Sequence, residues 1–361
     1  MIWITGGGTG GHLFPALNIA RELRSRRADL EVHYIGAARG LEAKVLVGSD
    51  LPHTLLPVVG DLHRGPFERL SFYARLAGSL SRCEMLYRRH RPRLVLGTGG
   101  YASYPAGQIA AWHGVPLFWQ EQNAQPGLVT RRLAPRCQAV FAGYPDLERA
   151  LPAARVLHTG NPVRTDIASG DRWRGRKTGG FAADDRVLLV LGGSGGAASI
   201  NRAVARIASV LSRQGPLRIW WQTGQRDFEY WQSHIQMELF PGTMCPFIDQ
   251  MPDAYAASDL VLARAGAMTT AEICAVGKPA VLVPFPHAAG GHQEKNVEVL
   301  VEAGAALSVR DQDLESSILP ETLLALAVDA THQARLAAGA RRLGRPGATA
   351  AIVDTLENAL L

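Results

Sequence analysis

The chain repeats one local plan in its two halves: a short apolar strand, a glycine-rich turn and the start of a helix. In the first half the strand is Ile2 to Thr5 and the turn is Gly6 to Gly11. In the second half the strand is Val187 to Leu191 and the turn runs from Gly192 to Gly196. Short apolar strands that alternate with helices are typical of parallel sheets covered on both faces. The repetition therefore predicts the α/β class, with two similar doubly wound domains facing each other across a cleft.

The length and the turn signals indicate where these domains meet. The 361 residues are enough for two domains that each bury a core. A short strand ends in turn residues at Thr159 to Arg164, so we expect an N-terminal domain at 1–162 and a C-terminal domain at 163–344. We expect the C-terminal helix, at about 345–361, to pack against one of the two, with the first domain as the candidate. The basic, glycine-rich stretch after the boundary is interpreted as a linker or surface arm; its basic residues are Arg172, Arg174, Arg176 and Lys177.

Composition favours anionic partners and a reducing compartment. The net charge of +6 suits phosphates, nucleic acid or an acidic lipid surface, and composition does not choose among them. The four cysteines lie far apart without metal-binding spacing, so we expect no zinc site. The chain starts directly in a strand and holds no apolar run of ~18 residues. We therefore expect a cytosolic protein whose membrane contact is peripheral.

Residues 259–296 carry most of the polar chemistry of the second half. Leu260 to Ala263 has the pattern of a buried strand, and Ala267 to Val276 has helical composition. Ligands of open α/β sheets bind at the carboxyl ends of such strands. Glu272 lies in the first two turns of the helix, so its carboxylate can accept two hydrogen bonds from a vicinal diol such as ribose. Gln293 opens the next helix beside the same crevice. The alternatives are that Glu272 is a helix-start charge and Gln293 a surface residue.

The glycine turns alone do not identify a ligand. Gly6, Gly8 and Gly11 satisfy the dinucleotide pattern GxGxxG, but tight turns in a nucleotide-free protein would give the same signal. That pattern also needs an acidic residue at the end of the next strand to bind the ribose. The next strands end in Gly36 and in Thr223 instead. An NAD-dependent oxidoreductase is therefore disfavoured.

Seven segments occur in an order that resembles one family. They span residues 6–296 and read GGGTGGHLFPAL, GTGGYASYP, QEQN, TGNPVR, LGGSGGA, RAGAMTTAE and PFPHAAGGHQEKN. They are similar to the MurG family of glycosyltransferases, which move N-acetylglucosamine from UDP-N-acetylglucosamine onto the undecaprenyl-diphosphate-linked muramoyl-pentapeptide of peptidoglycan synthesis. The resemblance implies the two-Rossmann-domain (GT-B) fold and inverting transfer to the C4 hydroxyl of the acceptor. We expect no cofactor and no metal. A UDP-sugar epimerase or a glycolipid synthase of the same fold is the alternative.

The resemblance also implies which residues meet the substrates. Ser194 would bind the diphosphate, Ile248 would offer backbone groups to uracil, and Glu272 would hold the ribose. Gln293 would read sugar hydroxyls, and Arg164 would supply positive charge to the departing UDP. The resemblance implies further contacts with the donor at Thr9, Gly10, Gly11, Asn123, Ala267, Met268, Thr269, Thr270 and Ala271, and a substrate contact at Tyr101.

Inverting transfer needs a base that takes the proton of the acceptor hydroxyl. We expect His12 in this role, because the helix N-terminus beside it favours the neutral imidazole. The alternative is that His12 only caps its loop. Glu121, in a polar run after the strand Pro116 to Trp119, is the second candidate for the base. The family commonly has histidine where this chain has Gln120, so any role of that histidine has no equivalent here.

An acceptor with a polyprenyl tail stays in the bilayer, so the enzyme has to reach the membrane surface. We expect the first domain to dock on the cytoplasmic face of the inner (plasma) membrane as a peripheral protein. A helical pattern over 67–91 has a core stripe that includes Tyr73 and Ala77. Beside it, an apolar patch with a basic rim is expected to meet anionic lipid, unless its aromatics belong to the core. The patch is Phe67, Leu70 and Phe72, and the rim is Arg64, Arg69, Arg75 and Arg82.

Two further patterns do not indicate an additional function. A nucleic-acid-binding module would use the same basic region, but it leaves the donor motifs unexplained, so we expect no nucleic-acid partner. Asp311-Gln312-Asp313 imitates a metal-binding DxD and is interpreted as an exposed turn, because it lies far along the chain from the donor loops.

Overall fold

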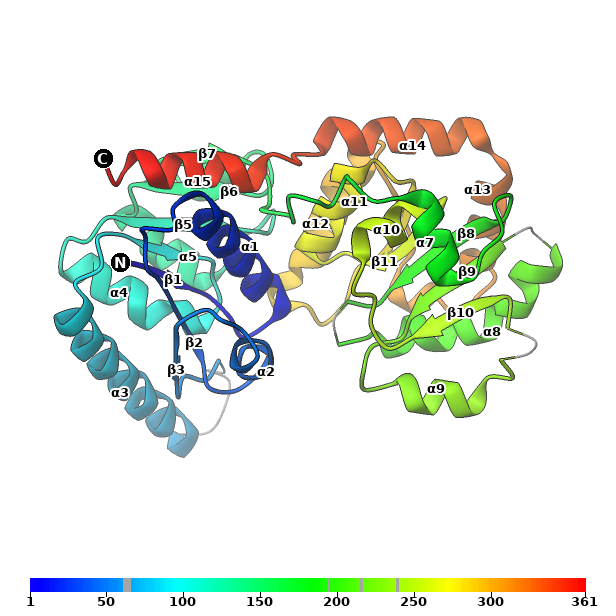
Figure 1. The fold of residues 1–361 in the computed structure, drawn as a ribbon. Helices are drawn as coiled ribbons and strands as arrows, with labels where there is room; N and C mark the ends of the chain where they lie inside the picture. Colours follow the sequence, from blue (N-terminus) through cyan, green and yellow to red (C-terminus); the bar gives the residue numbers. More distant parts are fainter. Residues whose placement is uncertain (61–65, 194, 215–216, 238–239) are drawn as a thin grey trace. The chain divides into compact units, whose positions relative to one another are not determined.

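The chain divides into two compact units. The computed structural model describes residues 1–60, 66–193, 195–214, 217–237 and 240–361. The first unit is Met1–Arg164 together with Gly347–Leu361, and the second is Thr165–Pro346 (Figure 1). Each unit has its own sheet and its own core.

A parallel sheet forms the centre of the first unit. Within its described residues the strand order is β3-β2-β1-β4-β5-β6-β7. One face is covered by helices α1 and α15 and the other by α3 and α4, with a separate apolar cluster on each face. The strands are β1 (Ile2–Thr5), β2 (Val32–Ala37), β3 (His53–Leu56), β4 (Val95–Gly97), β5 (Leu117–Glu121), β6 (Ala139–Ala142) and β7 (Val156–His158). The helices are α1 (Gly10–Arg26), α2 (Leu41–Val47), α3 (Pro66–His90), α4 (Tyr104–Trp112), α5 (Leu128–Leu133), α6 (Leu147–Ala150) and α15 (Ala348–Asn358).

The second unit repeats this plan. Within its described residues the strand order is β10-β9-β8-β11-β12-β13, again all parallel. Its core includes buried residues of β8, β9, β11 and β12 together with apolar faces of α8 and α13. The strands are β8 (Arg186–Leu191), β9 (Leu217–Gln222), β10 (Gly242–Cys245), β11 (Leu260–Arg264), β12 (Ala280–Val283) and β13 (Leu307–Ser308). The helices are α7 (Arg172–Gly179), α8 (Ala198–Gln214), α9 (Phe228–His234), α10 (Met251–Ala257), α11 (Ala267–Val276), α12 (His292–Glu302), α13 (Ile318–Val328) and α14 (Ala330–Leu343).

In both sheets the strand order reverses next to the first strand of the unit. The chain winds outward in one direction from β1 and then crosses to β4 on its other side. The second unit does the same from β8 to β11. Such a switch point opens a crevice at the carboxyl ends of the two central strands, where ligands bind in open α/β sheets. The two doubly wound parallel sheets predicted from the repeated strand and glycine turn are confirmed.

The basic stretch interpreted above as a linker is a helix, α7, that packs against α10. Asp171 caps it by accepting a hydrogen bond from the N–H of Arg174 at 2.7 Å. Gly175 lets the two helices approach, since a Cβ there would lie 2.2 Å from the carbonyl oxygen of Asp253. The guanidinium of Arg174 donates to both carboxylate oxygens of Asp253, at 2.5 and 2.7 Å. The interpretation was wrong because these acidic partners lie far along the chain.

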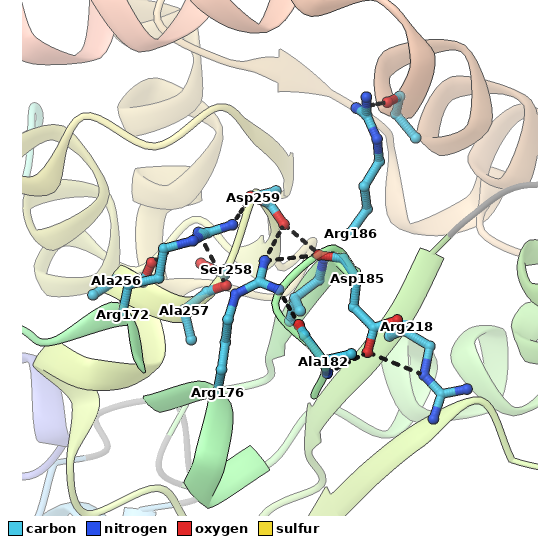
Figure 2. Close-up of polar contacts among 12 residues, drawn as sticks. Arg172, Arg176, Ala182, Asp185, Arg186, Arg218, Ala256, Ala257, Ser258 and Asp259 are labelled. Atoms are coloured by element: carbon cyan, nitrogen blue, oxygen red, sulfur yellow. Dashed lines mark hydrogen bonds and ion pairs between the residues drawn. The ribbon is translucent and has the colours of Figure 1, made fainter. Parts of the chain in front are cut away.

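Two more arginines of α7 bind the start of β11. Figure 2 shows Arg172 donating to Asp259 at 2.8 Å and to the carbonyls of Ala256 and Ala257 at the end of α10. Arg176, almost fully buried, donates to Asp259 at 3.3 Å and to the carbonyl of Asp185 at 2.7 Å. The arginines of α7 therefore tie α10 to the residues that immediately precede β8 and β11.

The core stripe predicted for α3 is partly wrong. Tyr73 is 59% exposed and Ala77 is exposed. The buried side chains lie further along the helix, at Ser79, Cys83 and Tyr87. The helix packs against α4, and its residues from Glu68 to Ala74 are exposed apart from a half-buried Phe72. The spacing of apolar residues in the sequence does not show which part of α3 other elements of the unit cover.

The C-terminal helix α15 belongs to the first unit. Ile352, Val353 and Leu356 are fully buried in the cluster that contains α1. Thr349, also buried, donates its hydroxyl hydrogen to the carbonyl of Val163 at 2.6 Å. The side-chain amide of Asn18 donates to the neighbouring Pro162 carbonyl at 2.9 Å. These two buried hydrogen bonds hold Pro162 and Val163, just before the chain passes into the second unit.

We predict that Thr349→Val destabilises the first unit. The substitution keeps the side-chain shape but leaves the buried Val163 carbonyl without the Thr349 donor, which costs about 1–3 kcal/mol. Urea unfolding measures the change. Thr355→Val is the matched control, because its hydroxyl donates to the Ala351 carbonyl on the exposed side of the same helix. Equal stabilities of the two variants would contradict a role for the Thr349 hydrogen bond.

Candidate functional site

The glycine turn after β1 meets the glycine turn after β4 at the switch point of the first unit. A Cβ at Gly100 would lie 2.0 Å from the carbonyl oxygen of Gly7, and Gly100 has a φ of 74°. Only glycine allows this approach of two backbones. Of the residues predicted to meet substrate here, Thr9 and Gly11 are exposed, and Gly10 and Tyr101 are half-buried. The structure therefore brings both turns to one edge of the sheet.

His12 is held by its Nδ1 atom. Nδ1 lies 2.7 Å from Oε1 of Gln122 and 3.0 Å from the carbonyl oxygen of Thr98. The amide nitrogen of Gln122 itself donates to the Thr98 carbonyl at 2.7 Å, so Oε1 is the acceptor of that side chain. Because both neighbours of Nδ1 are acceptors, the hydrogen-bond network assigns the proton to Nδ1. Nε2 is then the proton acceptor of the neutral ring.

Gln120, at the position where the family commonly has histidine, is a buried structural residue. Its amide nitrogen donates to Oδ1 of Asn161 at 2.9 Å. Asn161 in turn donates to the carbonyl of Gln122 at 2.9 Å. These bonds fix the polar run after β5 and with it the side chain that holds His12.

Glu121 is buried and accepts several hydrogen bonds. Its Oε1 accepts from the N–H and the side-chain amide of Asn123, at 3.1 and 3.2 Å. Its Oε2 accepts from the N–H of Gly127 at 3.1 Å and the hydroxyl of Thr130 at 2.5 Å. These four donors engage both oxygens of the carboxylate inside the protein. The geometry instead makes Glu121 the residue that orients the half-buried Asn123.

Sequence reasoning missed Glu42 on this edge. Glu42 is fully buried, and its Oε1 accepts from the N–H of Gly8 at 2.5 Å. Its Oε2 has no hydrogen-bond partner among the described residues. Burial, and then the Glu42 charge, raise the pKa of the neighbouring Tyr101 hydroxyl above its ordinary value. No local pattern signals this role, since 34 residues separate Glu42 from Gly8.

In the second unit, Glu272 lies on the second turn of α11 beside the carboxyl end of β11. The side chain is half-buried, and its Oε2 accepts a hydrogen bond from the hydroxyl of Tyr255 at 3.0 Å. Tyr255 is fully buried on α10 and was not identified from the sequence. Most of the run before Glu272 shares its exposure: Met268, Thr269 and Ala271 are half-buried, whereas Ala267 and Thr270 are buried.

The remaining predicted donor contacts of this unit are partly engaged within the protein. Oε1 of Gln293 accepts from the N–H of Phe285 at 3.0 Å, which orients its amide group. The N–H of Ile248 donates to Oε1 of Gln222 at 2.9 Å. This N–H is therefore not the backbone group that would contact uracil. Gln222, which was not identified from the sequence, also donates to the Gly193 carbonyl at 3.2 Å. It therefore links the glycine turn after β8 to Ile248.

Ser194 and Arg164 are the last two predicted contacts. Ser194 lies outside the residues that the structure describes. Arg164 is half-buried at the end of the first unit, not in the second.

Arg264, at the end of β11, organises the rim of the second crevice. This buried guanidinium binds Oδ1 of Asp311 at 2.6 Å and donates to the hydroxyl of Ser199 at 2.6 Å. Asp311, interpreted above as part of an exposed turn, is therefore half-buried and paired. Among the described residues, no three His, Cys, Asp or Glu side chains gather as metal ligands. Nor does any helix in the described part of the chain have the length and apolarity to cross a membrane.

Both halves of the chain match models of one protein family. Residues 2–142 match the glycosyltransferase family 28 N-terminal domain, and residues 187–350 match the glycosyltransferase family 28 C-terminal domain.

Similar proteins cover nearly the whole chain. A Moorella thermoacetica protein is 38% identical over 360 residues, covering 98% of this chain and 97% of its own. A Nitratidesulfovibrio vulgaris protein is 39% identical over 354 residues, covering 98% and 96%. Both are named UDP-N-acetylglucosamine–N-acetylmuramyl-(pentapeptide) pyrophosphoryl-undecaprenol N-acetylglucosamine transferase.

Solved structures agree with this relationship. The crystal structure of Acinetobacter baumannii MurG is 26% identical, with a TM-score of 0.79 and 99% of each chain covered. A UDP-GlcNAc 2-epimerase from Neisseria meningitidis, 17% identical with a TM-score of 0.66 and covering 99% of this chain and 100% of its own, shares the fold. From its two family domains and its near full-length relatives, the chain belongs to glycosyltransferase family 28.

Proposed function

We propose that the protein transfers N-acetylglucosamine from UDP-N-acetylglucosamine to the C4 hydroxyl of undecaprenyl-diphosphate-linked muramoyl-pentapeptide. The observation that carries the proposal is the 38% identity over 98% of the chain to a relative named for this transfer. The test is transfer of labelled N-acetylglucosamine from UDP to a short-chain lipid acceptor, with analysis of the products. Release of free UDP-sugar epimer without transfer would favour the epimerase alternative.

The first unit supplies the base in this proposal. The acceptor C4 oxygen attacks the anomeric carbon of the donor sugar while the bond from that carbon to the UDP oxygen breaks, with inversion. The hydroxyl proton goes to Nε2 of His12, which the Nδ1 contacts with Thr98 and Gln122 leave as the acceptor atom. Tyr101, Asn123 and the start of α1 at Thr9, Gly10 and Gly11 are assigned to substrate binding at this edge.

The second unit binds the donor in this proposal. The half-buried carboxylate of Glu272 holds the ribose diol, and the amide of Gln293 contacts sugar hydroxyls. Met268, Thr269 and Ala271, at the start of α11, contact the donor nucleotide in this proposal, and Ile248 lies beside its uracil. Arg164 offsets the charge that develops on the leaving UDP, and helix N-termini assist it without a metal ion.

The apolar patch for membrane docking is revised by the structure. Leu70 is 70% exposed, Tyr73 is 59% exposed and Phe72 is half-buried, with the Phe72 and Tyr73 rings in edge contact. Arg69 and Arg82 are exposed and Arg75 is half-buried. Arg64 and the Phe67 side chain lie outside the described residues. We propose that Leu70, Phe72 and Tyr73, the revised patch, meet the cytoplasmic face of an anionic inner membrane.

Substitution of the revised patch tests docking. Leu70→Ser with Tyr73→Ser is expected to weaken binding to anionic vesicles at least about tenfold, since burying each side chain in the lipid contributes ~1.5–3 kcal/mol. Wild-type binding should weaken with added salt but persist, because each basic residue contributes only ~1 kcal/mol. Co-sedimentation measures both.

The matched control for this test is Val47→Ser, which alters another exposed apolar residue of the same unit. Retention of wild-type vesicle binding by the folded double variant would exclude the revised patch.

Replacement of Glu272 tests the ribose contact. Glu272→Ala should weaken UDP-N-acetylglucosamine binding by ~2–4 kcal/mol, since two charge-assisted hydrogen bonds are lost. Glu272→Gln keeps an acceptor for Tyr255 and separates the loss of charge from a loss of fold. Calorimetric titration measures affinity, with the exposed Glu294→Ala as the control. A lower melting temperature with unchanged donor affinity would make Glu272 a structural residue.

Replacement of His12 tests the base. His12→Ala is expected to lower kcat by about 10²- to 10⁴-fold, the usual contribution of a general base. Donor affinity should stay at the wild-type value, because the proposed role of His12 is to take the proton of the acceptor hydroxyl. His234→Ala, an exposed histidine of the second unit, is the control. If His12→Ala keeps more than about a tenth of kcat, Glu121 becomes the next candidate despite its four donors.

A further inference from the structure

We propose that Tyr255 is a positioning residue whose hydroxyl orients the Glu272 carboxylate toward the ribose of the donor nucleotide. The inference rests on the proposed function of the second unit and goes beyond it, because it assigns a residue that does not touch the substrate. It starts from the contact between the Tyr255 hydroxyl and Oε2 of Glu272, at 3.0 Å.

The two side chains of this contact lie in different environments. Tyr255 is fully buried on α10, whereas Glu272 is half-buried on α11. A buried donor on the protein side therefore holds one oxygen of a carboxylate whose side chain still reaches the surface. Loss of this donor removes one of the contacts that orient the carboxylate, so more of its ordering has to occur when the ligand binds, which lowers affinity.

The Tyr255 hydroxyl remains a donor at physiological pH. Burial, and then the negative charge of Glu272, raise the pKa of this hydroxyl well above its ordinary value. The proton therefore stays on the tyrosine, and the carboxylate remains the acceptor. The contact therefore presents Oε2 of Glu272 as an acceptor that the buried hydroxyl holds in place.

The helix that carries Tyr255 is fixed at both ends. Near its start, Asp253 accepts two hydrogen bonds from Arg174 and one, at 2.8 Å, from the N–H of Asp171. At its end, Arg172 donates to the carbonyls of Ala256 and Ala257, as Figure 2 shows. Tyr255 lies between these hydrogen-bonded positions. The position of its hydroxyl is therefore well defined, and the hydroxyl can orient the Glu272 carboxylate.

A purely structural role for the hydroxyl predicts a different result. A buried tyrosine hydroxyl needs some acceptor, and Glu272 would then serve only to satisfy it. In that case removing the hydroxyl changes stability but not the recognition of ribose. In the positioning role, removing it weakens the contact to ribose in the folded protein.

The experiment compares UDP with 2′-deoxy-UDP by calorimetric titration. Wild-type protein is expected to prefer UDP by about tenfold or more, the value of one charge-assisted hydrogen bond. Tyr255→Phe removes one oxygen atom and is expected to reduce this preference at least about threefold, since the carboxylate is no longer preset. Tyr230→Phe, an exposed tyrosine of the same unit, should keep the wild-type preference. The preference is a ratio within one variant, so it does not depend on how much that variant is destabilised.

The outcomes separate the positioning role from the proposed ribose site. If Glu272→Ala abolishes the preference for UDP and Tyr255→Phe leaves it unchanged, Glu272 binds ribose and the role of Tyr255 is overturned. If Glu272→Ala itself keeps the wild-type preference, the ribose site is misplaced and both assignments fail. A loss of preference in both variants, with Tyr230→Phe unchanged, supports the positioning role.

Discussion

The close approach of backbone to backbone at the switch points is the constraint on which both sites depend. In the first unit a Cβ at Gly100 would lie 2.0 Å from the Gly7 carbonyl oxygen. In the second unit a Cβ at Gly196 would lie 2.2 Å from the carbonyl oxygen of Thr223. Because only glycine fits, the turns after the central strands can close over each sheet edge and bring distant polar residues together. His12 and Gln222 are held against such turns. Any side chain larger than hydrogen at these positions would displace the turn and the polar side chains held against it.

Three carboxylates at these edges show how hydrogen bonding separates structural from functional roles. A buried carboxylate is costly unless its oxygens are satisfied. Glu121 is satisfied by four donors and behaves as part of the scaffold. Glu272 is held at one oxygen by Tyr255 while its side chain stays half-exposed, which suits a binding residue. Glu42 is fully buried with one oxygen unpartnered among the described residues, and it holds the Gly8 N–H of the turn that leads to His12. The three residues carry the same chemical group and differ in their burial and in the donors around it.

Part of the basic charge of the second unit is paired with carboxylates and carbonyls of the same unit. Arg172, Arg174 and Arg176 of α7 pair with Asp253 and Asp259 and with backbone carbonyls. Arg264, at the end of β11, pairs with Asp311. A positive net charge therefore does not translate directly into a positive surface. For α7 the charge fixes α10, and α10 carries the tyrosine that contacts Glu272.

The sequence by itself determined the repeated strand, glycine turn and helix, and with them the fold class. It located α11 at Ala267–Val276 and β12 at Ala280–Val283, because apolar period, helix-stopping glycine and proline are local signals. The family resemblance added candidate substrate-binding residues near the ends of those strands. Only the tertiary structure decided what the side chains of these residues contact. The proton position on His12 depends on Gln122, 110 residues away, and the orientation of Glu272 depends on Tyr255, 17 residues before it. α7 resembled a linker because its acidic partners lie about 80 residues further on, as between Arg174 and Asp253, which are 79 residues apart. Hydrogen-bond partners are set by the order in which strands join a sheet, and that order is a property of the folded chain rather than of any local stretch of it.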